Sequence, residues 1–325
     1  MNSNHSICQV PFDPALMIGM RRARAIEDPA RLNLRSERLL PNNIIHHPTQ
    51  EDWLANLSAR FEKRGDRTIL AEQSHTGPLL IQKALFPEGS TICHTVVVHP
   101  PGGIAEGDKL SLNFEQGPGT HAVITTPAAT KWYKAPNRPA RQRVSIKLAA
   151  GAKLDWLPQE NILFDRARVE MSLRLSATFD ATAIGWDLIS LGRYASGERW
   201  LRGSLLIENQ IADEYDLPYW IERAMFEGTS PIRNAPQGLA GFSIFGTLWA
   251  FGAACTPELA ESLAVELPFE EDLRAGASCL PGGVLLIRAL SRRTETLRNA
   301  MISWWSNLRP LIHGVPARPL RLWAT

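Results

Sequence analysis

Residues 91–126 read TICHTVVVHPPGGIAEGDKLSLNFEQGPGTHAVITT, and this stretch predicts β structure. Segment 91–99 is rich in β-branched residues, whereas 111–115 and 121–126 alternate apolar and polar side chains, as strands with one buried face do. The turn sequence Gly117-Pro118-Gly119 separates the last two segments. The stretch therefore predicts a series of short strands joined by tight turns.

A weak internal repeat extends this pattern along the chain. The tetrapeptides SLNF at 111–114, SIKL at 145–148 and SLRL at 172–175 each precede a turn of small residues and a second apolar strand. Their starting positions differ by 34 and 27 residues, which is too irregular for a strict solenoid. We expect a mainly β fold of stacked sheets or hairpins, either β-helix-like or sandwich-like.

Helical periodicity is found mainly near the C-terminus, where we expect about two helices. Thr256 suits the N-cap of a first helix, with Pro257 in the first helical position and leucines every fourth residue after it. A strand is expected at 284–290, followed by a second helix from about 291 to 308. We expect Pro310 to end this helix, because proline disrupts helix interiors.

The composition is that of an ordinary globular protein. The 325 residues contain 35 Lys and Arg against 33 Asp and Glu, so the net charge of +2 does not suggest nucleic acid as the main partner. Four cysteines without a C-x-x-C spacing indicate reduced thiols. The longest apolar run near the start, residues 15–20, is too short for a signal sequence or a membrane span, so we expect a cytoplasmic protein without a membrane anchor.

Two regions differ in their patterning. Residues 1–50 show no sustained period of 2 or 3.6, and we interpret them as a mobile N-terminal extension. Residues 51–325 carry the strand and helix patterns and form the expected scaffold domain.

The common catalytic motifs are missing. The nearest approach to a phosphate-binding loop, GGIAEGDK at 102–109, places Asp108 at the position of the phosphate-binding lysine, and a carboxylate there would repel a phosphate. Neither a dinucleotide-binding fingerprint nor a G-x-S-x-G elbow is present. We therefore expect that the protein is not an enzyme.

Three histidines provide the main alternative, a β-rich, cupin-like metalloenzyme. His94, His99 and His121 fall within 28 residues of predicted β structure. In an unbroken strand, however, residues five apart point to opposite faces, so His94 and His99 could not bind one ion without a bulge.

Several segments between residues 77 and 203 together resemble the UreD (also called UreH) family of urease accessory proteins. They are GPLLIQKALFPEGSTICHTVVVHPPGGIAEGDKL, TTPAATKWYKA, AGAKLDWLPQENILFD and GWDLISLGR, and the closing WWSNLRPLIHGVPARPLRLWAT agrees with them. The resemblance covers about Trp53 to Thr325. Glu106 departs from the glycine that is usual before Gly107-Asp108.

The resemblance implies a non-catalytic β scaffold. Members of the family bind the adaptor UreF and, through it, the nickel GTPase UreG, and dock on apo-urease so that nickel reaches its active site. We accordingly expect no tightly bound cofactor, no stable metal site and only transient Ni²⁺.

Carboxylates in apolar surroundings are the candidates for a metal path, because a buried acid must be paired or face an ion. They are Asp108, Asp187 and Glu222. The structural alternative for each is a salt bridge, and for Asp187 the expected partner is Arg193, six residues along the same strand. The candidates for interface contacts or internal pairing are Thr130, Lys131, Glu160 and Asp155.

Overall fold

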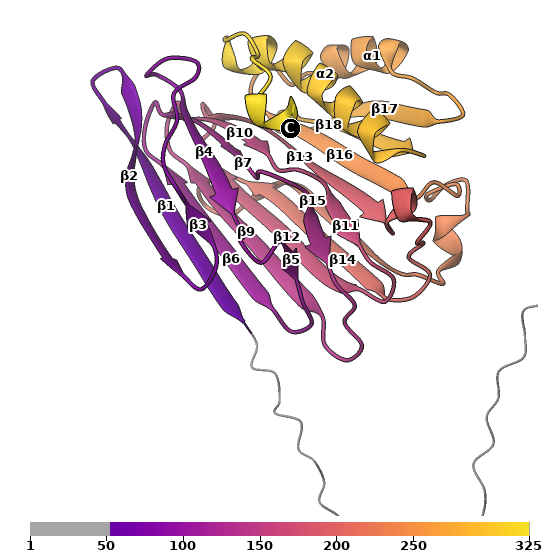
Figure 1. The fold of residues 1–325 in the computed structure, drawn as a ribbon. Helices are drawn as coiled ribbons and strands as arrows, with labels where there is room; N and C mark the ends of the chain where they lie inside the picture. The colour runs from indigo at the N-terminus through magenta and orange to yellow at the C-terminus, as the bar shows by residue number, and fades with distance from the viewer. Residues whose placement is uncertain (1–52, 325) are drawn as a thin grey trace, which may run out of the picture. The chain divides into compact units, whose positions relative to one another are not determined.

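The computed structural model describes residues 53–324, so the N-terminal extension predicted for residues 1–50 lies outside the described residues. Two β-sheets and two α-helices make up the described part (Figure 1). The first sheet has seven strands in the order β15 (Pro218–Glu227), β14 (Ser204–Ala212), β12 (Arg168–Ala177), β9 (Ala140–Leu148), β6 (Lys109–Gln116), β1 (Leu54–Arg64) and β2 (Arg67–Thr76).

The second sheet has eleven strands. Its main path runs β17 (Leu273–Leu280), β18 (Val284–Ser291), β16 (Ile244–Phe251), β13 (Thr182–Leu191), β10 (Lys153–Leu157), β7 (His121–Thr125), β4 (Cys93–Val98) and β3 (Leu80–Ile81). Three short strands lie off this path: β5 (Gly103–Ile104), β8 (Thr130–Trp132) and β11 (Asn161–Leu163). The 3₁₀ helices are η1 (Tyr194–Ser196), η2 (Pro231–Arg233) and η3 (Arg321–Ala324).

The repeated tetrapeptides fall on neighbouring strands of the first sheet. β6, β9 and β12 pair in parallel, and the strand that follows each of them, β7, β10 and β13, pairs in parallel in the second sheet. Each repeat is thus a strand, a turn and a strand that crosses to the other sheet. The mainly β architecture of stacked sheets is confirmed, although the repeats form this double layer and antiparallel pairing is confined to other strand pairs, such as β1 with β2 and β14 with β15.

Two turns stack where the chain crosses between the sheets. Gly119 follows β6 and Gly151 follows β9, with φ angles of +64° and +63°, and the N–H of Gly119 donates to the carbonyl of Ala150 at 2.9 Å. These left-handed conformations favour glycine, which explains why small residues follow the repeated tetrapeptides.

Both helices cover the outer face of the second sheet (Figure 1). One apolar cluster fills the space between the two sheets, and another lies between the second sheet and the helices α1 (Pro257–Glu266) and α2 (Thr294–His313). Trp305 of α2 is fully buried in the second cluster. None of the helices within 53–324 combines the length and the apolarity that crossing a membrane requires.

The predicted start of α1 is confirmed, whereas the predicted end of α2 is wrong. Thr256 accepts a hydrogen bond from the N–H of Leu259 at 3.2 Å, as an N-cap does. Helix α2 continues past Pro310 to His313 and ends at Gly314, whose φ is 70°. A proline in the last turn removes one N–H donor, and the burial of Ile312 and His313 against the core holds that turn in place.

Candidate functional site

Two cavities lie between the sheets and meet at shared residues. The first, of about 110 Å³, is lined by residues that include His99, Thr130 and Trp156. The second, of about 560 Å³, lies between strands at one side of the sandwich and is lined by residues that include Glu222 and Arg288. Asp187, Ile207 and Asn209 line both cavities, so these three side chains form the boundary between them.

Asp187 and Glu222, predicted separately from sequence, come together at this boundary. Asp187 lies on β13 of the second sheet, and Glu222 lies on β15 of the first. Asn209 of β14 joins them, since its Nδ2 donates to Asp187 Oδ2 at 3.3 Å and to Glu222 Oε2 at 3.5 Å. One amide therefore separates two carboxylates that arise from opposite sheets.

The two carboxylates differ in their charge environment. Arg288 of β18 donates from Nε and Nη2 to Glu222 Oε1 at 3.1 and 2.8 Å, which compensates the charge of Glu222. Among residues 53–324 no such cation pairs with Asp187; its burial, and then the nearby charge of Glu222, raise the pKa of Asp187 to about 6. The expected pairing of Asp187 with Arg193 is wrong: β13 ends at Leu191, and Arg193 pairs with Glu198 at 2.6 Å.

The raised pKa of Asp187 leads to a prediction of how the stability of the folded chain depends on pH. Below the ordinary pKa of 3.8, Asp187 is neutral in both the folded and the unfolded chain; as the pH rises through about 6, the folded state must accept a buried charge and loses stability. Asp187→Asn removes that cost. We expect the variant to be about 1–2 kcal/mol more stable than the natural chain at pH 8, because water in the cavities limits the effect, and equal to it at pH 4.

Urea unfolding of both chains at pH 4 and pH 8 measures this difference. A gap of the same size at both pH values would contradict the assignment, because a mere packing effect does not titrate.

Asp108 lies apart from the other two metal-path candidates. Its Oδ2 accepts the N–H of Ala105 at 2.7 Å and its own N–H donates to the carbonyl of Ala105 at 3.1 Å, so the side chain caps a turn. It lines neither cavity. Its charge acts on His99 of the first cavity: burial lowers the pKa of His99, and Asp108 opposes that shift.

Thr130, Lys131 and Glu160 are close in space but have different surroundings. The N–H of Thr130 donates to the carbonyl of Glu160 at 2.9 Å, and Thr130 lines the first cavity. Lys131 is exposed on β8. Glu160 Oε2 lies 3.9 Å from Nη1 of Arg298, which connects the strand region to helix α2.

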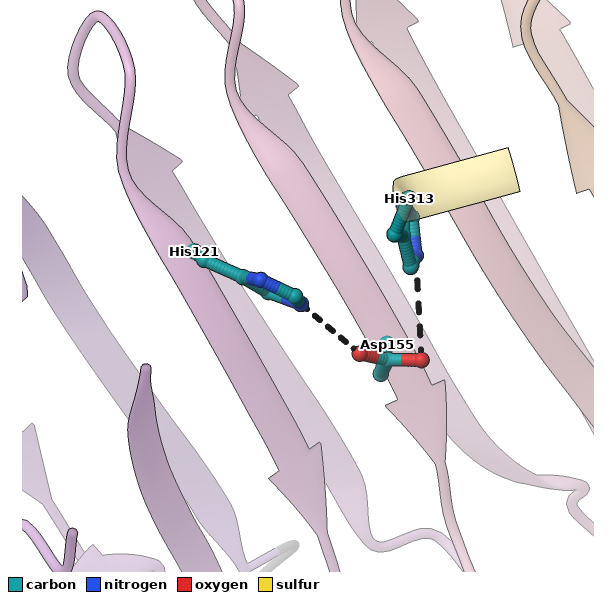
Figure 2. Close-up of side chains that lie close together, drawn as sticks. All are labelled: His121, Asp155 and His313. Atoms are coloured by element: carbon teal, nitrogen blue, oxygen red, sulfur yellow. Dashed lines mark hydrogen bonds and ion pairs between the residues drawn. The ribbon is translucent and has the colours of Figure 1, made fainter. Parts of the chain in front are cut away.

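Asp155 is the centre of a buried polar network on the helix side of the second sheet (Figure 2). Its Oδ2 accepts from His121 Nε2 at 3.0 Å and from Arg309 Nε at 3.1 Å, and its Oδ1 accepts from Trp305 Nε1 at 2.7 Å. Although burial alone raises the pKa of this carboxyl, His313, His121 and Arg309 together hold it well below its usual range.

The network continues through the buried guanidinium of Arg309. Its Nη1 and Nη2 donate to Glu88 at 2.7 and 3.1 Å, and Glu88 also contacts His94 Nε2 at 2.8 Å. Segments far apart in the sequence are therefore joined by buried, paired charges between the second sheet and α2. Removing one partner of such a buried ion pair is strongly destabilising, because it leaves the other charge buried without compensation.

His121, Asp155 and His313 form a group whose potential metal-ligand atoms lie within 4.8 Å of one another. His313 Nδ1 lies 2.7 Å from Thr182 Oγ1 and its Nε2 lies 3.2 Å from the carbonyl of Leu154. A carbonyl only accepts, so Nε2 carries the proton, and burial lowers the pKa of His313 to about 3. Both this nitrogen and the carboxylate are therefore already occupied, and the geometry fits a structural network better than a metal centre.

The three histidines of the metalloenzyme alternative do not share one site. His99 lines the cavity between the sheets, whereas His94 and His121 belong to the network beneath α2. The sequence reasoning also missed Asn209 and Arg288. Asn209 falls in the run SLLIENQIA of β14 and shares one face of the strand with Leu205, Ile207 and Ile211, so its place in this alternating apolar pattern is the available signal.

Comparison with known proteins adds independent information. The family described as "UreD urease accessory protein" matches residues 54–324. A Ralstonia nicotianae protein named urease accessory protein UreD is 52% identical over 84% of this chain and 94% of its own length. Proteins of the same name from Polynucleobacter asymbioticus and Bordetella pertussis are 44% and 39% identical, over 88% and 85% of this chain and 99% of their own lengths.

Proposed function

Because the chain belongs to the UreD family of urease accessory proteins, we propose that it is a non-catalytic scaffold through which nickel passes to apo-urease. In this proposal it docks the adaptor UreF and the nickel GTPase UreG on apo-urease in the cytoplasm. GTP hydrolysis belongs to the GTPase, since the sequence contains no phosphate-binding loop of its own.

The observation that carries the proposal is the meeting of two cavities at Asp187, Ile207 and Asn209. A divalent cation that leaves water needs compensating negative charge and oxygen atoms along its way. Asp187 supplies a carboxyl without a paired cation, and Glu222 supplies a second one 3.5 Å from the shared amide. Together they lower the cost of crossing between the cavities.

Polar groups in the first cavity support an aqueous interior. Trp156 lines that cavity, and its indole N–H is buried without an acceptor within the described part of the chain. The cavity volume of about 110 Å³ is enough for several water molecules, and a water can accept the indole proton while donating to a carboxylate. A hydrated ion is stabilised in such surroundings.

Weak binding suits a protein that passes its metal on. Arg288 already neutralises Glu222, and Asn209 presents an N–H to both carboxylates, so neither group leaves a strong ligand set for the ion. The buried group of two histidines and Asp155 is occupied by hydrogen bonds. In this proposal the chain binds Ni²⁺ only transiently and holds no resident cofactor.

The scaffold role needs surfaces for partners. β15 exposes Ile221 and Met225, whose exposed fractions are 64% and 72%, on the face opposite to the one that lines the second cavity, and Phe269 is exposed where it lines that cavity. Exposed apolar side chains of this kind are typical of protein-protein contacts.

Complementation tests the proposal. Urease is expressed with its accessory proteins in cells that lack this chain and in cells that contain it, and the nickel content of purified urease is measured along with co-purification of the adaptor and the GTPase. We expect urease to be nickel-poor without the chain and the partners to co-purify with it. Full nickel loading in its absence, or catalytic turnover by the chain alone, would overturn the proposal.

A further inference from the structure

Two cysteines lie next to each other in the apolar layer between α1 and the second sheet. Cys279 Sγ lies 3.3 Å from the carbonyl oxygen of Cys255, and both residues belong to the same apolar cluster. Both also adjoin Leu285: its backbone N–H donates to the thiol of Cys255, and Cys279 pairs with it across β17 and β18. The two side chains therefore occupy one small region although 24 positions separate them in the sequence.

The two cysteines lie in a turn and on an edge strand. Cys255 lies in the turn that follows β16, where its N–H donates to the carbonyl of Gly252 at 2.9 Å, and it directly precedes Thr256, the N-cap of α1. Cys279 lies on β17, which is an edge strand. A disulfide requires a sulfur-sulfur distance of about 2 Å, so a change of side-chain rotamer with a small turn movement has to bring the sulfurs together.

We propose that Cys255 and Cys279 form a reversible disulfide by exchange with a low-molecular-weight disulfide such as glutathione disulfide. The thiolate of Cys279 attacks one sulfur of the small disulfide, which gives a mixed disulfide and releases one small thiolate. The thiolate of Cys255 then attacks the Cys279 sulfur and releases the second small thiolate. The chain loses two protons and two electrons, and one small disulfide is reduced to two thiols.

Exposure determines the order of these steps. Cys279 is half-buried, whereas Cys255 is buried, so the small disulfide meets Cys279 first. Burial raises the pKa of Cys255 to about 12 and also raises the pKa of Cys279. Little thiolate is present at pH 7, so the exchange is slow there, and its rate increases about tenfold for each pH unit up to pH 9.

The proposed disulfide would affect the strand that lines one side of the second cavity. Arg274, Ala275 and Gly276 of β17 line that cavity. The disulfide would tie the start of α1 to the same strand and so restrict its movement. Oxidation thereby rigidifies one wall of the cavity.

The test uses the full-length chain with Cys8→Ser, which leaves three cysteines, incubated with glutathione disulfide at pH 7, 8 and 9 and mapped by mass spectrometry of its peptides. We expect a linked peptide pair carrying Cys255 and Cys279 and a thermal midpoint raised by about 5 °C or more. Dithiothreitol should reverse both changes. Cys93, which is also buried, should stay reduced and serves as the internal control.

Single substitutions separate the two steps. Cys255→Ser should stop the reaction at a mixed disulfide on Cys279, and Cys279→Ser should leave Cys255 unmodified. The inference is overturned if the linked pair does not form at pH 9, or if Cys93 reacts at the same rate, since that would mean that oxidation follows unfolding.

Discussion

Asp155→Asn is expected to abolish stable folding of the chain. The carboxylate accepts N–H groups from His121, Trp305 and Arg309 on its two oxygens, and an amide replaces one of those oxygens by a further donor. The guanidinium of Arg309, which is fully buried, keeps Glu88 and loses its second counter-charge. Breaking a buried, hydrogen-bonded ion pair costs about 3–5 kcal/mol, a large share of the roughly 5–15 kcal/mol that stabilises a whole domain.

Soluble yield and urea unfolding measure this loss of stability. Two further variants serve as a milder change in the same network and as a surface control. Trp305→Phe removes one hydrogen-bond donor to Asp155 and keeps an aromatic ring of smaller size, so we expect a smaller loss, of about 1–2 kcal/mol, and a folded chain. Arg174→Gln removes an exposed ion pair with Asp216 and should change the stability by less than about 1 kcal/mol. A natural unfolding curve for Asp155→Asn would show that the network does not hold α2 in place.

The secondary structure could be predicted from the sequence wherever local patterning decides it. Alternating side chains identified β6, and the Thr256 cap identified α1, because each of these signals is contained within a few residues. β7 was also predicted as a strand, but all five of its residues are buried, so it does not have the exposed face that alternation implies. The order in which the strands pair was harder to predict from the sequence. A parallel neighbour such as β9 for β6 lies about thirty residues away, and no turn sequence specifies which strand crosses to the other sheet. The end of α2 was missed because burial of the last turn outweighed the local effect of Pro310.

The candidate site could also be predicted only in part, because only some of its residues stand out in the local sequence. Asp187 and Glu222 stood out because acids in apolar runs must be paired or face an ion. Their partners could not be found in this way. Arg288 is 66 positions from Glu222 and reaches it from the opposite sheet, whereas the nearby Arg193 that sequence spacing favoured belongs to a turn beyond the strand. Asn209, a neutral residue, gave no electrostatic signal although it contacts both acids.

Nickel delivery should depend on charge at the boundary between the cavities. Asp187→Asn and Glu222→Gln each keep the side-chain shape and remove one negative charge, so the cost of moving a divalent cation past them increases. We expect the nickel content of urease from cells carrying either variant to fall roughly threefold to tenfold, corresponding to about 0.7–1.4 kcal/mol. Complex assembly should persist, because Arg288 is 51% exposed and water can replace its lost partner.

Measuring nickel content and complex yield in the same lysates distinguishes this path from a structural salt bridge. If Glu222 serves mainly to hold Arg288, the complex itself should be lost. Normal nickel content and normal complex yield in both variants would remove the two carboxylates from the proposed path.

Asn209→Asp should have the opposite effect on metal binding at the same place. Its amide nitrogen lies 3.3 and 3.5 Å from the two carboxylate oxygens, so an aspartate there would place three carboxylates around one point lined by both cavities. Oxygen-rich, multiply charged sites bind divalent cations tightly. We expect the purified variant to retain about one Ni²⁺ or Mn²⁺ per chain through dialysis, whereas the natural chain retains none.

Asn113→Asp is the matched control, since Asn113 is exposed on β6 and the substitution is chemically the same. It should retain no metal. A scaffold that holds its ion cannot pass it on, so Asn209→Asp should also reduce the nickel content of urease while the complex still forms. Retained metal together with normally loaded urease would mean that nickel takes another route, and failure to retain metal would mean that the two carboxylates cannot act on one ion. In the proposed path, a neutral amide between the two acids would thus keep binding weak enough for the cation to leave.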